Sequence, residues 1–496
     1  MQRALFAIAA ASMAIACDAG VVRAQVQAPT FATSGNADFD SWRHDFASRA
    51  LAQGRDPAVL RQLLSGLSPD PSIITLDQQQ PEFVSPVWDY VNNRVTDRRI
   101  AAGQQMKATL GSTLTQIQQR YGVDSDIVLG IWALESNLGQ APLNYTAPQA
   151  LATLAFEGRR RAQFENYLLA LCQMVERGLA TPDELRSSWA GALGQPQFMP
   201  DVYLTLAVDW DGDGKRDIWT NNADVAASIA NYLQNKGWQA GQPIFDEVRL
   251  PSGFDFSLAD GSTRSVSDWE GIGVRRVDGS AWTATDRTLQ SQLFLPAGAS
   301  GPALLLHPNF AVIRRYNNSD RYALVVALLA RAFEGRSGLV ASWPTQVGSL
   351  NRDQTLELQT LLNSLGYNSG TPDGLFGSGT RRAVRAFQAD QHIPADGFPT
   401  TSLLNQVRTR AGVSVDPPAS SSSSSPGSSS PRALDTRGIR ELERLLGRLG
   451  YHVGRADGRI TAQTRTAIRA FQHRRHLDVT GRATSDVLEE ARRAAR

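Results

Sequence analysis

Apolar residues recur every three or four positions through most of the first half of the chain, a spacing that predicts helices. Strand-like alternation is confined to 247–295, where Val248/Leu250 and Phe254/Phe256 predict a small β-rich insert. The expected fold class is therefore mainly α (α+β). The predicted helices are one that begins at Phe39, 58–67, one or two over 90–121, 125–139, 150–156, 161–178, one that begins at 181–182, 224–238 and 323–333.

The stretch 125–139 has the clearest helical pattern. Ser125 is a candidate N-cap and Gly139 a candidate stop. One carboxylate, Glu135, lies within the apolar run, one turn after Ile131. A carboxyl held against apolar neighbours is harder to ionise, so we expect a raised pKa, as a general acid near neutral pH requires. The alternative is a solvated residue near a helix end.

The stretch 187–200, SSWAGALGQPQFMP, breaks the helical pattern. Its glycines permit unusual φ/ψ values or close backbone approach, and its prolines fix the shape of the loop. Ser188, Gln195 and Gln197 supply directional hydrogen bonds, which suits recognition of sugar hydroxyl and acetamido groups. Turn chemistry alone does not distinguish this interpretation from a plain structural turn.

An acidic loop, DWDGDGKRD, follows at 209–217. Asp209, Asp211 and Asp213 occupy positions 1, 3 and 5 of an EF-hand-like loop. Lys215, at position 7, would offer its backbone carbonyl. Oxygen ligands at this spacing suit Ca²⁺.

The acidic loop departs from the EF-hand pattern at position 12. Thr220 stands there in place of a bidentate Glu, so Asp217 or Asp224 would have to replace that ligand. A turn without metal is the alternative.

The C-terminal third contains a repeat of about 60 residues. LLNSLGY at 361–367 matches LLGRLGY at 445–451, and AVRAFQ at 383–388 matches AIRAFQ at 467–472, each pair offset by 84 positions. Each copy suits a small helical module. A Pro/Ser-rich stretch at 411–432 separates the copies and predicts a flexible linker.

Two tethered copies of one module imply a repetitive ligand and a gain in effective concentration. The stretch 431–496 contains 15 arginines against 8 acidic residues, a net charge of +7 that would draw it toward an anionic matrix. Nucleic acid is a poor partner, because these arginines lack interleaved aromatics and the whole chain carries only +2.

The N-terminal residues have the pattern of an export signal. Arg3 precedes the apolar run Ala4–Ala16, which is too short for an ordinary transmembrane helix, and Val22-Arg23-Ala24 offers small residues where a signal peptidase reads. We therefore expect a signal peptide at 1–24 and a soluble periplasmic protein. The alternative is a lipoprotein acylated at Cys17, with a membrane tether only in that case.

Only two cysteines occur in the 496 residues, Cys17 and Cys172. Cleavage after Ala24 would leave Cys172 alone, so no intramolecular disulfide would form. Cys172 lies in a helical apolar run, which favours a small buried core residue.

Taken together, these stretches resemble the B-type soluble lytic murein transglycosylases, followed by two peptidoglycan-binding modules. The resemblance covers nearly all of the mature chain and rests on six motifs in order: IWALESNLG, LATLAFEGRRRAQF, SWAGALGQPQFMPDVY, DWDGDG with Ile218-Trp219, ANYLQNKGW and NFAVIRRYNNSDRY. The repeats resemble the peptidoglycan-binding family through LGY, DG, T, AFQ and G. One departure is Leu138, where the family often has an aromatic residue.

The resemblance implies a lysozyme-like catalytic domain over 36–340, peptidoglycan-binding domains over 349–410 and 433–493, and peptidoglycan as the partner of a monomer. It implies that Glu135 is the single acid/base. The implied glycan-binding positions are Ser188, Gln197, Tyr232, Tyr316 and Tyr322, and the implied metal positions are Asp209, Asp211, Asp213, Lys215 and Asp224.

The implied reaction cleaves the MurNAc–GlcNAc β-1,4 bond without water and leaves a 1,6-anhydroMurNAc end. No cofactor is required for this chemistry, and calcium would stabilise the fold. Ordinary glycosidases use a pair of carboxylates. Two alternatives remain open: a hydrolytic muramidase and a non-catalytic wall-binding protein.

Overall fold

The structure, a computed structural model, describes residues 28–78, 86–346, 348, 350–413, 434–451, 453–454, 456–458, 460–475 and 481–495. The expected signal peptide at 1–24, Cys17 and nearly all of the expected linker lie outside the described residues. The chain forms two compact units, Met1–Val415 and Asp416–Arg496. Among the described helices, none has both the length and the apolar character that crossing a bilayer requires.

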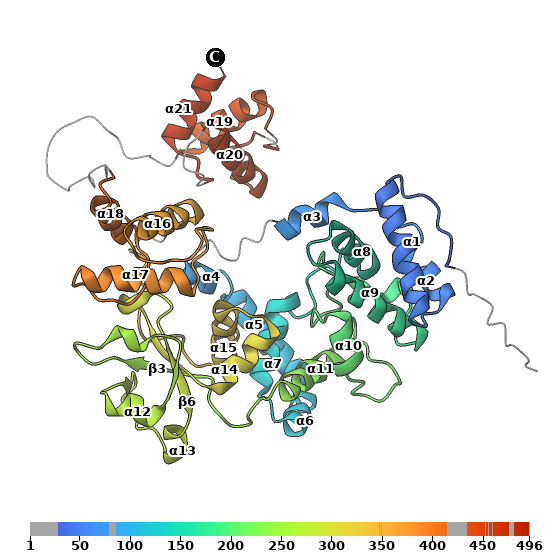
Figure 1. Ribbon diagram of the computed structural model, residues 1–496, viewed down its shortest axis with the longest axis horizontal. Coiled ribbons are helices and arrows are strands. Elements are labelled where there is room, and N and C mark those ends of the chain that lie inside the picture. Colours follow the sequence, from blue (N-terminus) through green and yellow to red (C-terminus); the bar gives the residue numbers. More distant parts are fainter. Residues whose placement is uncertain are drawn as a thin grey trace, which may run out of the picture. The chain divides into compact units, whose positions relative to one another are not determined.

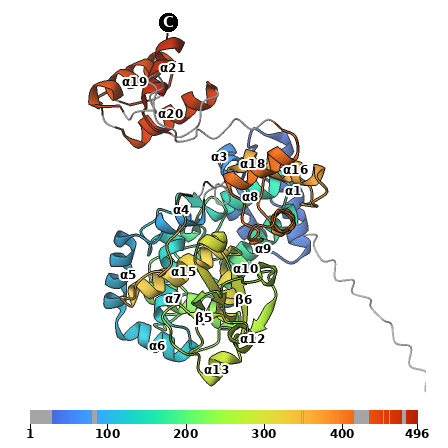
Figure 2. The same ribbon diagram turned by 90° about the vertical axis from the view of Figure 1, so that its left-hand side faces the viewer.

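The first unit is mainly helical and is built around one large core (Figures 1 and 2). Its helices before the C-terminal modules are α1 (Ala37–Ala52), α2 (Pro57–Leu64), α3 (Pro71–Gln78), α4 (Val87–Asn92), α5 (Asp97–Leu110), α6 (Ser112–Tyr121), α7 (Ser125–Ser136), α8 (Ala147–Glu157), α9 (Arg161–Glu176), α10 (Pro200–Leu206), α11 (Asn222–Asn235), α14 (Pro308–Tyr316) and α15 (Asp320–Phe333).

Helix α7 lies among α5, α6, α11 and α15, and it is buried over most of its length (Figure 1). Gly130 lets α15 approach closely, because a Cβ there would lie 2.9 Å from the carbonyl oxygen of Val326. The predicted helix is confirmed, but both of its ends differ from the predicted ones. Asp124 is the N-cap, while Ser125 is already helical and donates its hydroxyl to the Leu114 carbonyl at 3.2 Å.

The C-terminus of α7 also differs from the expectation. The helix ends at Ser136, three residues before the predicted stop at Gly139. Asn137, Leu138 and Gly139 all have positive φ, at 51°, 56° and 83°. The chain therefore turns sharply just after Glu135.

Two other helix predictions need correction. The segment 90–121 contains parts of three helices, since Thr96 caps the start of α5 and Gly111, with φ 42°, separates α5 from α6. The helix expected to begin at 181–182 is a single 3₁₀ turn, η2 (Pro182–Glu184). Its capping box is present, but the chain then enters a short strand instead of continuing as a helix.

The β-rich insert is a five-stranded antiparallel sheet with the order β4-β6-β7-β3-β5. It extends beyond the predicted range at both ends, because β3 begins at Phe245 and β7 ends at Leu306. Phe254 and Phe256 are not on a strand: their rings pack edge to face at 5.5 Å beside a second core. The strands of this sheet are β3 (Phe245–Arg249), β4 (Thr263–Ser265), β5 (Arg275–Arg276), β6 (Gln290–Phe294) and β7 (Ala303–Leu306). A separate two-stranded sheet is formed by β1 (Tyr145–Thr146) and β2 (Arg186–Ser187).

A polar network lies inside this insert. Asp246 on β3 accepts hydrogen bonds from Trp282 at 2.6 Å and Arg276 at 3.1 Å, and it lies 3.1 Å from His307 Nε2. The other ring nitrogen of His307 lies 2.7 Å from Ser291 Oγ. Because Ser291 and His307 are both buried, this arrangement holds the sheet together.

Each C-terminal repeat folds as three helices around its own core, as expected. The first module, in the first unit, consists of α16 (Arg352–Ser364), α17 (Ser378–Asp390) and α18 (Thr401–Arg410). The second module consists of α19 (Thr436–Arg448), α20 (Ala462–Arg474) and α21 (Ser485–Ala494).

Cys172 lies in α9 and is a free, buried cysteine. Burial raises the pKa of its thiol to about 12. The predicted role of Cys172 as an unreactive core residue is therefore confirmed.

Candidate active site

Glu135 lies in the last turn of α7 and is half-buried. Its Oε1 accepts a 2.6 Å hydrogen bond from the hydroxyl of Tyr322, which is 187 positions away in the sequence. Tyr322 is in the first turn of α15, where the Ser319 side chain caps its backbone N–H. Since α15 packs along α7, the fold brings the predicted acid together with a predicted binding residue.

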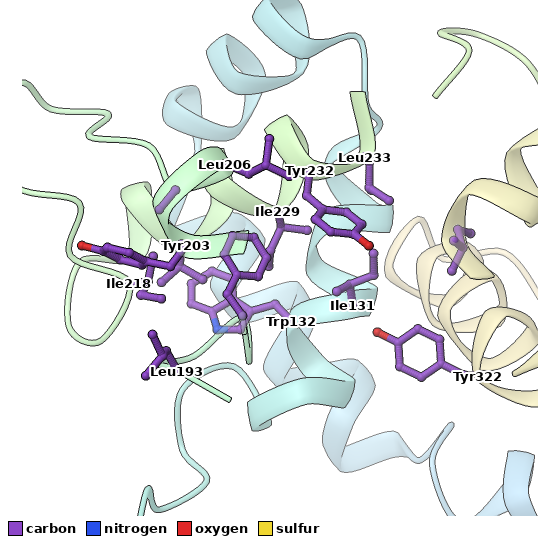
Figure 3. Close-up of a cluster of buried hydrophobic side chains, with 14 of the residues drawn as sticks. Ile131, Trp132, Leu193, Tyr203, Leu206, Ile218, Ile229, Tyr232, Leu233 and Tyr322 are labelled. Atoms are coloured by element: carbon purple, nitrogen blue, oxygen red, sulfur yellow. The ribbon is translucent and has the colours of Figure 1, made fainter. Parts of the chain in front are cut away.

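Tyr316 and Tyr232 form an aromatic cluster with Phe198 beside this pair. The rings of Tyr232 and Tyr316 are 4.7 Å apart, and Phe198 lies 5.9 Å and 6.1 Å from them. The hydroxyls of Tyr232 and Tyr322 project from α11 and α15 toward the space beside Ile131 (Figure 3). The Tyr316 hydroxyl donates to the carbonyl of Pro196 at 2.6 Å, which joins α14 to the loop 187–200.

The tyrosines of this cluster keep their protons at neutral pH. Burial, and then the negative charge of Glu135, raise the pKa values of both Tyr316 and Tyr322 well above the ordinary value of 10.0. Burial also raises the pKa of Tyr232. These hydroxyls therefore remain hydrogen-bond donors at neutral pH: Tyr322 donates to Glu135, Tyr316 to the Pro196 carbonyl and Tyr232 to the Arg315 carbonyl.

The loop 187–200 is held close to the helical core. A Cβ on Gly191 would lie 2.3 Å from Leu151, and one on Gly194 would lie 2.6 Å from the Ile218 carbonyl oxygen. Close approach explains both glycines, as the sequence suggested.

Ser188 and Gln197 are both partly exposed in this loop. The Gln197 amide donates to the Gly194 carbonyl at 2.8 Å, and its backbone has an unusual φ of 56°. Ser188 Oγ accepts the Ala192 N–H at 3.3 Å. The loop conformation therefore fixes both predicted binding residues near the aromatic cluster.

Gln195, which the sequence grouped with possible sugar-binding side chains, is instead a buried supporting residue. It accepts the indole N–H of Trp132 at 2.9 Å and donates to the Trp219 carbonyl at 2.8 Å. It also fills the space that a Cβ on Gly139 would need. Gln195 thus ties α7 to the segment that follows the acidic loop, and only the spatial closeness of these elements identifies that role.

The acidic loop gathers three of the predicted metal-binding residues. Ligand atoms of Asp209, Asp211 and Asp213 lie within 4.8 Å of one another. Gly212 and Gly214 donate their backbone N–H groups to Asp209, which closes the loop. The backbone N–H of Lys215 donates to Asp213 at 2.8 Å.

Asp224 is not part of this group. It is fully buried at the start of α11, and its two carboxylate oxygens accept the backbone N–H groups of Trp210 and Asp217 at 2.8 Å and 2.7 Å. Burial, and then the charges of Asp211 and Asp209, raise its pKa to about 6. The structure therefore shows Asp224 as an anchor for both ends of the loop.

Comparison with known families identifies both parts of the chain. The transglycosylase SLT domain family matches residues 38–331. The peptidoglycan binding domain family matches 351–407 and 436–490.

Individual relatives agree with this assignment. Membrane-bound lytic murein transglycosylase B of Escherichia coli (strain K12) is 30% identical over 315 residues, which cover 58% of this chain and 84% of the relative. The crystal structure of SltB3 from Pseudomonas aeruginosa in complex with NAG-anhNAM-pentapeptide is 43% identical, with a TM-score of 0.72 over 75% of this chain and 99% of that chain.

A second similar structure contains a metal. The Escherichia coli lytic transglycosylase Slt35 in complex with calcium is 26% identical, with a TM-score of 0.53 over 63% of this chain and 97% of that chain. The family match spans more than half of the chain and includes every residue described above around Glu135. The protein therefore belongs to the SLT-domain family of lytic murein transglycosylases, enzymes that act on peptidoglycan, and it carries two peptidoglycan binding domains.

Proposed function

We propose that Glu135 is the single acid/base of a lytic transglycosylase that cleaves the MurNAc–GlcNAc β-1,4 bond and leaves a 1,6-anhydroMurNAc end. The observation that carries the proposal is the 2.6 Å hydrogen bond from Tyr322 to the Glu135 carboxyl. Burial and then the charge of Glu135 raise the pKa of Tyr322 well above 10.0, so this hydroxyl stays protonated. Ordinary glycosidases place two carboxylates around the bond, whereas in the proposed mechanism the substrate supplies the nucleophile.

The proposed reaction proceeds without water. Protonated Glu135 gives its proton to the glycosidic oxygen as the bond from that oxygen to C1 of MurNAc breaks. Positive charge develops at C1, and the C6 hydroxyl of the same MurNAc attacks it. Glu135 then removes the proton of that hydroxyl, so the 1,6-anhydro ring closes and the acid is restored.

Tyr322 acts as a positioning residue in this scheme. Its hydroxyl donates to Oε1 and so fixes the orientation of the Glu135 carboxyl. Ser188, Gln197, Tyr232 and Tyr316 belong to the surface that we propose contacts the glycan. The partly exposed hydroxyl of Ser188 and amide of Gln197 suit the hydroxyl and acetamido groups of a sugar.

The test is mass spectrometry of peptidoglycan fragments released by the purified protein and by Glu135→Gln. We expect anhydromuropeptides from the wild type and a loss of about 10²- to 10⁴-fold for the variant, the usual contribution of a general acid. Reducing-end products would identify a hydrolytic muramidase. Wall binding without products from either protein would identify a non-catalytic binding protein.

We also propose a structural calcium ion at Asp209, Asp211 and Asp213, with the carbonyl of Lys215 as a further ligand. Three clustered carboxylates and a carbonyl are the donors that Ca²⁺ prefers, and water would complete its coordination. The Asp224 carboxylate accepts the backbone N–H groups of Trp210 and Asp217 and so holds both ends of the loop. The ion would stabilise the loop, whose following segment Gln195 connects to α7, and it would take no part in the chemistry.

The site of action that we propose is the periplasm, with residues 1–24 as the export signal and lipidation of Cys17 as the alternative. Peptidoglycan is the substrate of the family, and an exported chain would reach it there.

A further inference from the structure

A cavity of about 390 Å³ lies between the catalytic domain and the first module, within the first unit. One wall is the turn from α14 to α15 with the start of α4, and the other is formed by α16, the start of α17 and the loops around Phe376 and Phe398. The volume is in the range of sites that hold small ligands. The catalytic wall includes Asp320 and Arg321, which immediately precede Tyr322.

The cavity is strongly basic. Four arginines line it, against Asp320 as the acidic lining residue: Arg314, Arg321, Arg352 and Arg381. Apolar side chains, including Phe294, Phe376 and Phe398, complete the lining. This lining suits a ligand that carries both carboxylate groups and apolar groups.

Two of the arginines interact with their surroundings in different ways. Arg314 Nε lies 3.1 Å from Asp320 Oδ1, and its guanidinium donates to Asn318 at 3.1 Å. Arg381 lies over the Phe376 ring at 5.0 Å, and burial lowers the pKa of its guanidinium. A partly desolvated cation such as Arg381 gains most from an anionic partner.

The two walls are held together by specific contacts. Asp396 of the module accepts the Ala299 backbone N–H at 2.8 Å, and Arg385 donates to the Ala259 carbonyl at 2.7 Å. A Cβ on Gly298 would lie 2.7 Å from Phe398, so the surfaces touch closely.

The second module shares only part of this lining. At the positions equivalent to Arg352, Phe376 and Phe398, offset by 84, its sequence has Thr436, Ile460 and Arg482, whereas Arg381 corresponds to Arg465. The first module thus supplies side chains to this cavity that the second module does not have.

We propose that this cavity, which we call the arginine pocket, binds the carboxylates of a peptide stem attached to MurNAc. The inference rests on the proposed function, because it assigns a place to the peptide part of the same substrate. The Cα of Arg321 is about 3.8 Å from that of Tyr322, and an extended pentapeptide reaches about 17 Å. A peptide carried by a sugar at Glu135 can therefore span the distance to the pocket.

The test compares glycan strands that carry peptide stems with strands from which an amidase has removed them. The variant is Arg321→Ala/Arg352→Ala, and the matched control is Arg382→Ala, an exposed arginine on α17 outside the pocket. We expect the wild type to have a higher kcat/KM for strands with peptide stems than for strands without them. In the double variant the ratio of these two kcat/KM values should fall about tenfold, because KM for the peptide-bearing strands rises. The control should keep the wild-type ratio. An unchanged ratio in the double variant would overturn the proposal.

A binding measurement separates this inference from the proposed function. The free peptidoglycan pentapeptide is titrated by calorimetry into the full chain, into the double variant and into the single variant Arg352→Ala, which changes one exposed side chain. Binding should weaken in both variants, at higher salt and when the peptide carboxyls are amidated. Equal binding of the amidated peptide would overturn the pocket assignment. Peptide binding by a wild type that releases no anhydro products would instead overturn the proposed function alone.

Discussion

At the scale of single residues, the position of Tyr322 constrains the chemistry most. Its side chain is 4% exposed, and its hydroxyl donates to Glu135. The sequence predicted Glu135 from an apolar helix and a resemblance, and it predicted Tyr322 from the resemblance alone. Local periodicity could not pair them, because the hydrogen bond joins two helices that are far apart in the chain.

Replacing Tyr322 by Phe should reduce kcat on soluble glycan strands about 10- to 100-fold, with little change in KM. The reason is that one preorganised donor to a catalytic group is lost while the ring packing remains. Tyr167→Phe on α9, whose hydroxyl bonds to Gln163, is the control and should keep wild-type kcat. An equal loss of kcat in both variants would contradict the assigned role.

At the scale of elements, the polar network of the β-rich insert should control acid stability. Burial alone would raise the pKa of Asp246, but hydrogen bonds from His307, Trp282 and Arg276 lower it below the ordinary value of 3.8. A carboxyl with a lowered pKa in the folded state stabilises that state above its unfolded pKa. That stability is lost as the pH falls through the folded pKa.

The variant Asp246→Asn should therefore have a lower melting temperature at pH 7 and a shallower loss of stability below pH 4. The expected loss at neutral pH is about 1–3 kcal/mol, the usual effect of breaking charged hydrogen bonds. Melting curves followed by tryptophan fluorescence, from pH 3 to 7, measure both effects. Asp278→Asn changes an exposed carboxylate in the same insert and should cost less; an equal or larger loss would argue against the network.

The acidic loop makes a second prediction at this scale. Saturating Ca²⁺ should raise the melting temperature of the wild type by several degrees, since an ion at 100 times its Kd adds about 2.7 kcal/mol. Asp211→Asn should remove most of that increase because it removes one of the three clustered carboxylates. Asp201→Asn, on α10 outside the loop, should keep it. The same increase in Asp211→Asn and the wild type would refute the calcium site.

At the scale of the whole molecule, the two modules share a fold but belong to different compact units. The first module belongs to the same compact unit as the catalytic domain, and the second forms a unit with its own core. The sequence repeat predicted two similar modules. It could not show that one of them contacts the catalytic domain, because a repeat pattern does not reveal which surface residues face another domain.

A chain truncated after Val413 should still cleave soluble strands but bind insoluble peptidoglycan at least tenfold more weakly. The tethered second module adds effective concentration and, over 431–496, a net charge of +7. Co-sedimentation with peptidoglycan at low and high salt measures the difference, which should shrink as salt increases. Adding the separate second module in trans should not restore binding. Full binding by the truncated chain would mean that the second module has another role.

The sequence by itself determined the features that depend on near neighbours. The 3.6-residue periodicity predicted the helices, the 84-residue offset predicted the modules, and the spacing of Asp209, Asp211 and Asp213 predicted their cluster. Strand β7 was missed because its four residues are all buried, and a continuous apolar run has no alternation to recognise.

Only the tertiary structure decided which distant residues meet. The hydrogen bond of Tyr322 to Glu135, the place of Gln195 between α7 and the segment that follows the acidic loop, and the arginine pocket each join segments that are remote in the sequence. Such contacts depend on how whole elements pack. A local pattern specifies which face of a helix is apolar but not which helix covers it.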